Sequence, residues 1–110
     1  ESGMDLPKPR WLLSLCLIAV VPASHALDEA RQQTLKHLLV QDCGSCHGLW
    51  MKGGLGPALT PEALAGKSRE YLVGTVIHRR PGTAMPPWKA LLSEEEAGWM
   101  IDRLLQGVEP

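Results

Sequence analysis

Residues 43–47 read CGSCH, so two cysteines lie three positions apart and a histidine follows directly. Such a pair serves as a redox dithiol, as half of a zinc site or as the attachment point of a c-type haem. A dithiol of this kind normally lies beside a parallel sheet, and zinc needs a second ligand pair, which the sequence lacks. Haem attachment uses all three side chains, because Cys43 and Cys46 form thioethers with the two vinyl groups and His47 binds the iron. We interpret the motif as the site of one covalent haem c, with zinc and dithiol chemistry as the alternatives.

The second axial ligand decides whether the iron is closed or open to small molecules. Met85 lies in the stretch PGTAMPPW, where the prolines exclude a helix and hold the chain extended. A loop stiffened in this way holds a thioether in place at little entropic cost, so we predict Met85 as the distal iron ligand. The competing candidates are Met51, Met100, His37 and His78.

Each competitor has a simpler interpretation. Met51 follows His47 too closely to reach the opposite face of a haem, and Met100 falls on the apolar stripe of a predicted helix. The two histidines lie on predicted helices, where a solvated side chain is usual. For Met85 itself, the alternative is a loop methionine that fills a gap in the core.

Further residues fit a haem pocket. The carbonyl of the rigid Gly56-Pro57 segment is placed to accept a hydrogen bond from His47, which would fix the imidazole ring. Trp88, with Trp50 and Tyr71, is expected to pack around the porphyrin. Pro57 and Trp88 are the pocket residues that we predict.

The N-terminus reads as an export signal. A short basic flank precedes the apolar run WLLSLCLIAVV at residues 11–21, which is too short to cross a bilayer, and small residues follow it. We expect cleavage after Ala26, with a retained membrane anchor as the alternative. Residues 1–3 precede Met4 and look like a non-native remnant, so residues 1–26 are set apart from a single mature domain, residues 27–110.

The mature segment is predicted to be all-α, with helices over about 28–40, 61–66, 69–79 and 94–106 and long ordered loops between them. Caps are expected at Asp28, Thr60, Ser68 and Ser93. On the third helix we expect a buried face of Tyr71, Leu72, Thr75 and Val76; on the last, an apolar stripe of Ala97, Met100, Ile101, Leu104 and Leu105. With no phenylalanine and one tyrosine, this core is thin without a large cofactor. The net charge of −1 is uninformative about nucleic-acid or membrane partners, and no basic patch with interleaved aromatic residues argues for either. We therefore expect no nucleic-acid partner.

The order of three motifs, Cys43-x-x-Cys46-His47, Gly56-Pro57-x-Leu59 and Met85-Pro86, resembles class I cytochromes c over essentially all of residues 27–110. The strings KGGLGPALTPEALAGKSREYL and RPGTAMPPWKALLSEEEA are similar to those of NirC-type proteins. These are small periplasmic monohaem cytochromes associated with cytochrome cd1 nitrite reductase.

The resemblance implies a class I cytochrome c fold of three to four helices and ordered loops around one haem. It also implies a periplasmic electron-transfer protein, not an enzyme, which takes electrons from an upstream periplasmic donor. The electrons would go to cytochrome cd1 nitrite reductase; alternatives are a redox or assembly factor in haem d1 maturation and a haem-based ligand sensor with a labile Met85. No membrane association is expected after signal cleavage. One departure concerns the crossing of the terminal helices, where the usual glycine and aromatic pair is missing, so the crossing is expected to depend on Ala30 or Gly98.

Overall fold

The structure is a computed structural model that describes residues 3–5, 7, 16–20 and 27–110. Most of the predicted export signal, including the expected cleavage after Ala26, lies outside these described residues. No helix in the described part of the chain is long and apolar enough to cross a bilayer.

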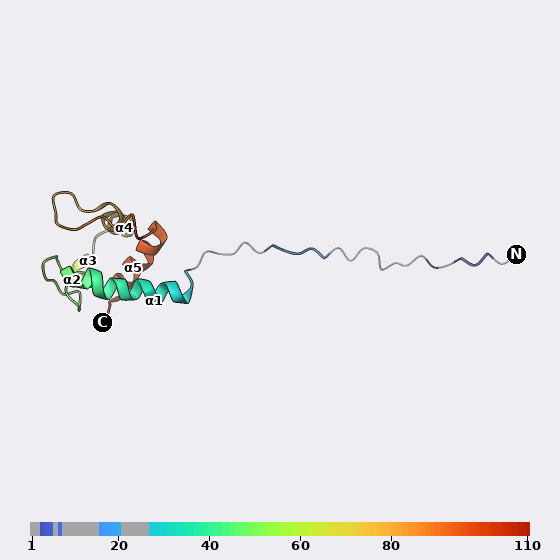
Figure 1. The fold of residues 1–110 in the computed structure, drawn as a ribbon, viewed down its shortest axis with the longest axis horizontal. Helices are drawn as coiled ribbons and strands as arrows, with labels where there is room; N and C mark the ends of the chain where they lie inside the picture. The colour runs from blue at the N-terminus through green and yellow to red at the C-terminus, as the bar shows by residue number, and fades with distance from the viewer. Residues whose placement is uncertain (1–2, 6, 8–15, 21–26) are drawn as a thin grey trace.

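The described residues form helices and loops without a strand, which confirms the all-α prediction. In chain order the elements are α1 (Glu29–Leu38), the π-helical segment η1 (Leu39–Cys43), α2 (Gly44–His47), α3 (Pro61–Leu64), α4 (Arg69–His78) and α5 (Glu94–Gln106). Figure 1 shows α1 along one side of the domain, α4 on the opposite side and α5 between them. The loops that follow α2 and α4 both lie at the end of the domain remote from the N-terminus (Figure 1).

The first helix is longer than predicted. Asp28 caps it as expected, accepting a hydrogen bond from the backbone N–H of Arg31. We expected the helix to end near Val40, but a π turn, with the Gly44 N–H bonded to the Leu39 carbonyl, carries it onward into α2. Such π turns are frequent at functional sites. Here the turn joins the CGSCH motif to a rigid helix.

The later helices begin at the predicted caps. The hydroxyls of Thr60, Ser68 and Ser93 each accept a hydrogen bond from a backbone N–H three residues on. At α5 the Glu96 carboxylate also accepts from the Ser93 N–H at 3.0 Å, which completes a capping box. The sequence therefore determined where these helices start.

The core joins every helical element except α2, together with the Met51 loop and Leu92. A fully buried leucine in such a core contributes about 1.5–3 kcal/mol. Its buried residues are Leu35, Leu39, Met51, Leu64, Leu72, Ile77, Leu92, Ala97, Met100, Ile101 and Leu104. On α5 the predicted stripe is confirmed except for Leu105, which is 37% exposed.

The buried face predicted for α4 was wrong in part. Leu72 is buried as expected, but Tyr71 is 51% exposed, and Ile77 is buried in its place. The reason is that α4 is covered from two directions. Its contacts with α5 are extensive, while the segment after Pro87 bonds to its far end, with the Lys89 N–H donating to the Ile77 carbonyl.

The two residues expected at the crossing of the first and last helices have different surroundings from those predicted. Ala30 is exposed, and Gly98 is buried under the guanidinium of Arg69, which comes from α4 and not from α1. A Cβ at Gly98 would collide with that guanidinium, whose Nε donates to Asp102 at 2.8 Å. The absence of a side chain at Gly98 thus serves the α4–α5 contact. An ion pair between Arg31 and Glu96 instead connects α1 to α5.

We predict that Glu96→Gln destabilises the protein at neutral pH and not in acid. The hydrogen bond from Arg31, and then those from Ser93, lower the pKa of Glu96 below its usual value. The stabilisation is therefore complete above the unfolded-state pKa of about 4.3 and disappears as the pH falls through the lower folded value. Urea unfolding at several pH values measures the difference.

Glu95→Gln is the matched control for this prediction, because it removes the same charge from the same helix turn without an Arg31 partner. If both substitutions lose the same stability at pH 7, or if the Glu96→Gln deficit persists at pH 3, the ion pair is not its source.

Candidate haem-binding site

The two motif cysteines lie on one helical unit. Cys43 ends η1 and Cys46 lies within α2, so their three-residue spacing places them on neighbouring positions of the helix surface. Cys43 packs against the core, whereas Cys46 is exposed. Burial, followed by the charge of Asp42, raises the pKa of Cys43 to about 11. A zinc ligand or reactive dithiol needs a thiolate, so this environment favours neither alternative.

His47 is oriented by Pro57. Its Nδ1 lies 2.6 Å from the Pro57 carbonyl oxygen, which can only accept, so Nδ1–H donates. The neutral ring then carries its free lone pair on Nε2, the state in which an imidazole binds a metal. The hydrogen bond that we expected from the sequence is therefore present, and it fixes both the tautomer and the direction of the ring.

The loop after α2 is bound tightly around His47. The Gly56 N–H donates to the Cys46 carbonyl and the Gly53 N–H to the His47 carbonyl, both at 2.8 Å. The loop leaves α2 through Gly48, whose φ of +88° is in the left-handed region. These bonds satisfy the last carbonyls of the helix and hold Pro57 opposite the imidazole.

Gly56 forms a cradle for the imidazole. A Cβ built on Gly56 would lie 2.7 Å from Cε1 and 2.8 Å from Nδ1 of His47, closer than atoms tolerate. Sequence analysis recognised the Gly-Pro pair but missed this steric role. The repeated glycines of residues 53–56 were the available signal, yet only the folded loop shows which one lies against the ring.

Met85 lies on a separate loop that is closed at its neck. The Trp88 N–H donates to the Val76 carbonyl at 3.0 Å, and the Lys89 N–H donates to the Ile77 carbonyl at 3.2 Å. Trp88 is half-buried against the core, and Met85 is also half-buried. Within the described residues, no hydrogen bond joins this loop to residues 43–57. The two segments therefore form separate walls of the candidate site. Each wall is held by its own hydrogen bonds and by its packing against the core.

The other sequence candidates lie elsewhere. Met51 and Met100 are 1% and 2% exposed, and both belong to the core. His37 and His78 are exposed on helices. Trp50 is 59% exposed, and its expected packing against the porphyrin stays a prediction.

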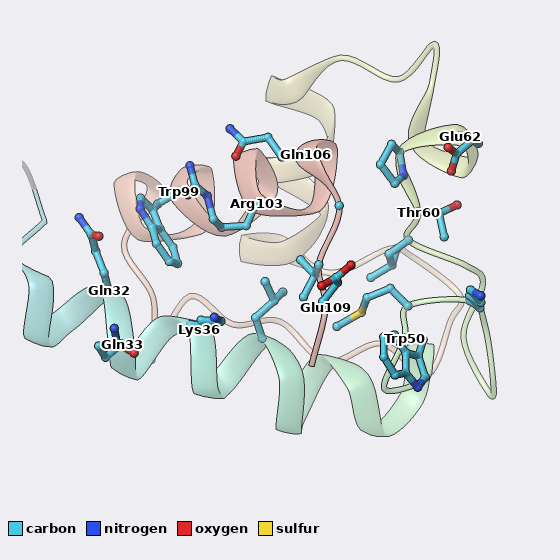
Figure 2. A pocket seen from close by; sticks show the side chains of 17 residues that line it. Gln32, Gln33, Lys36, Trp50, Thr60, Glu62, Trp99, Arg103, Gln106 and Glu109 are labelled. Atoms are coloured by element: carbon cyan, nitrogen blue, oxygen red, sulfur yellow. The ribbon is translucent and has the colours of Figure 1, made fainter.

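A cleft of about 770 Å³ lies between α1, α5 and the 50–62 segment (Figure 2). Trp99 and Arg103 enter it from α5, with the Arg103 guanidinium 5.2 Å from the Trp99 ring centroid, and Gln32 and Lys36 line it from α1. Of the residues predicted to contact the haem, only Trp50 lines this cleft. Neither motif cysteine, nor His47, nor Met85 lines it.

The residues present fit a covalent haem. Two thiols one helical turn apart, an imidazole with its metal-binding nitrogen free and a thioether on a stiff loop form the donor set of a c-type centre. The absence of a side chain at Gly56 leaves the room that the His47 imidazole occupies. No cluster of three or more His, Cys, Asp or Glu side chains suited to another metal occurs in the part of the chain that the structure describes.

Comparisons with known proteins identify the family of the chain. Residues 30–102 match the family described as cytochrome c oxidase, cbb3-type, subunit III. The chain is 60% identical to cytochrome c55X of Pseudomonas aeruginosa over 100 residues, which span 88% of this chain and 84% of the relative.

Two solved structures are also similar. A c-type cytochrome NirC is 66% identical, with a TM-score of 0.70 over 72% of this chain and 93% of that one. The dihydro-haem d1 dehydrogenase NirN, in complex with DHE, is 31% identical with a TM-score of 0.62, and the match covers 68% of this chain but 16% of NirN. The cytochrome c fold, predicted above, is thereby confirmed.

The chain therefore belongs to the c-type cytochromes. It is a small NirC-type cytochrome c with one covalently bound haem c.

Proposed function

We propose that the protein is a one-electron carrier that donates electrons to cytochrome cd1 nitrite reductase. The observation that carries the proposal is the fixed imidazole of His47, held by Pro57 with its metal-binding nitrogen free. A carrier works best when its metal ligands keep the same geometry in both oxidation states. The hydrogen-bonded 47–57 unit meets that requirement.

The haem-holding residues in this proposal are Cys43 and Cys46 as thioether donors, His47 as proximal ligand and Met85 as distal ligand. When bound, the haem supplies an Fe³⁺/Fe²⁺ couple that takes one electron from a reduced donor and returns it to an oxidised acceptor. Pro57 keeps the His47 ring oriented, and Trp88 anchors the Met85 loop through its bond to Val76. Both contacts limit rearrangement of the two segments when the oxidation state changes.

The nitrite-reduction context is supported by the relatives. The similar solved structure carries the name NirC, and NirN, named as a dihydro-haem d1 dehydrogenase, contains a similar domain. The NirN similarity favours a second candidate function, electron exchange during haem d1 maturation. In both roles the chain transfers electrons and does not itself convert a substrate.

We also propose a periplasmic location. The basic flank, short apolar run and small residues of the N-terminus are the support for export, with residues 27–110 as the mature cytochrome domain. A haem attached through Cys43 and Cys46 would then function outside the cytoplasm.

The first test concerns Met85. We predict that Met85→Ala abolishes the near-infrared charge-transfer band of methionine-bound ferric haem and lowers the reduction potential by on the order of 0.1 V, within the roughly 0.8 V that axial ligands span. Met51→Leu, a volume-conserving change in the core, is the control and should keep the band. A high-spin ferric spectrum of the wild-type protein at neutral pH would instead support a ligand sensor.

The second test concerns the partner. We predict that reduced protein mixed with oxidised cytochrome cd1 in a stopped-flow instrument transfers one electron in a concentration-dependent phase, with a second-order rate constant of about 10⁶ M⁻¹s⁻¹ or higher. The same experiment with oxidised protein and a haem d1 maturation enzyme acting on its substrate tests the second candidate. Fast transfer only with the maturation enzyme would replace the first proposal by the second.

A further inference from the structure

We propose that Met51 is a positioning residue for the His47 imidazole, because its side chain attaches the loop that carries Pro57 to the core. This inference rests on the proposed role of His47 as the proximal haem ligand, and it identifies what keeps that ligand oriented. Met51 acts through the loop between residues 48 and 59, and its role requires no contact with the haem.

Met51 is the only buried residue between His47 and Pro57, a segment that the structure describes throughout. Its side chain belongs to the hydrophobic core, whereas its neighbours Trp50 and Lys52 are exposed. The other residues of the segment are exposed or half-buried, and four of them are glycines, which have no side chain to pack. The Met51 side chain is therefore the attachment of this segment to the core.

The backbone of Met51 has a conformation that residues with a side chain disfavour. Its φ of +55° is in the left-handed region, where Cβ comes too close to the following carbonyl oxygen. The same segment has glycines at its other positions of positive φ, Gly48 and Gly53, and glycine adopts such angles without this cost. A disfavoured conformation persists only where the surrounding contacts determine it. For Met51, burial of the side chain supplies those contacts.

The two ends of the loop are hydrogen-bonded to the backbone of Met51. Its N–H donates to the Gly48 carbonyl, and its carbonyl accepts from the Leu59 N–H, both at 2.8 Å. The first bond closes the turn that follows His47, and the second holds the chain two residues after Pro57. A displacement of Met51 would therefore loosen the loop on both sides of the hydrogen bond between His47 and Pro57.

The remaining hydrogen bonds of the loop are weak anchors without Met51. The N–H groups of Gly53 and Gly56 donate to the last carbonyls of α2, but water competes for such bonds wherever the loop is exposed, as it is at Gly53. When the loop opens, the Pro57 carbonyl leaves the imidazole, and the ring loses both its fixed plane and the bond that makes it a better electron donor. Burial of Met51 thus maintains the orientation of the proposed proximal ligand.

Hydrogen exchange in the haem-loaded, reduced protein tests this inference. The Nδ1–H of His47 and the amides that close the loop exchange with solvent when the loop opens, and NMR of the ¹⁵N-labelled protein follows them. We expect Met51→Ala to accelerate exchange of this ring proton and of the Gly53 and Gly56 amides at least tenfold, because loss of a buried methionine side chain makes opening easier. Met51→Leu, which fills a similar volume, should stay within about threefold of the wild-type rates.

The matched control is Met100→Ala, because Met100 is a similarly buried core methionine that lies on α5 and not in the loop. It should lower the free energy of global unfolding in urea without accelerating exchange of the His47 ring proton. Equal acceleration by Met51→Ala and Met100→Ala would indicate a general loss of stability. Acceleration of the loop amides without the ring proton would mean that Met51 holds the loop but not the imidazole. Either result would overturn the inference, as would wild-type exchange rates in Met51→Ala.

A measurement on the wild-type protein applies if Met51→Ala does not fold. At low urea concentrations, the His47 ring proton and the amides of Gly53 and Leu59 should exchange with one common free energy of opening, which is smaller than that of global unfolding. Different free energies of opening for the ring proton and the Leu59 amide would contradict the role of Met51. The proposed carrier function would survive these results, because the cytochrome cd1 experiment tests it separately.

Discussion

The hydrogen bond between the His47 imidazole and the Pro57 carbonyl is the contact on which the arrangement of the site depends. It selects the tautomer that leaves Nε2 free, and it sets the plane of the ring. The bond is possible only because Gly56 leaves space for the imidazole and because two backbone bonds return the loop to the carbonyls of Cys46 and His47. The orientation of His47, which we propose as the proximal ligand, is thus fixed by backbone hydrogen bonds and needs no long side chain to be ordered.

The site has two walls that are stabilised independently. One wall is the helical unit that ends at His47 together with its glycine-rich loop. The other is the Met85 loop, which is paired to the end of α4 at Val76 and Ile77. No hydrogen bond of the described residues joins the two walls, so each is held by its own backbone bonds and by the core, in which Leu35, Leu39 and Met100 are buried. A domain this small has a small hydrophobic core, so it gains stability from binding a large, rigid, apolar cofactor.

The charges at the helix ends follow the helix dipoles. Acidic residues lie in the first turns of α1 and α5, where they interact favourably with the N-terminal ends of the helix dipoles. Basic residues lie in the last turns of α1 and α5, and His78 and Arg79 lie at the end of α4. Local helix stability therefore accounts for where these charges lie, on a protein that is nearly neutral overall.

Much of the fold and of the candidate site was predictable from the sequence, because the signals were local. The caps at Thr60, Ser68 and Ser93 act within three residues, and the chemistry of CGSCH is contained in five. The proline-rich context of Met85 likewise restricts the backbone on its own.

Other features were decided only by tertiary structure. The π turn before Cys43, the burial of Ile77 in place of Tyr71 and the contact of Gly98 with Arg69 each depend on segments distant in sequence. The same is true of the cradle at Gly56, where the loop must close before the ring and the glycine meet. Caps and motifs are properties of neighbouring residues along the chain, whereas packing and close approach depend on which elements meet in space.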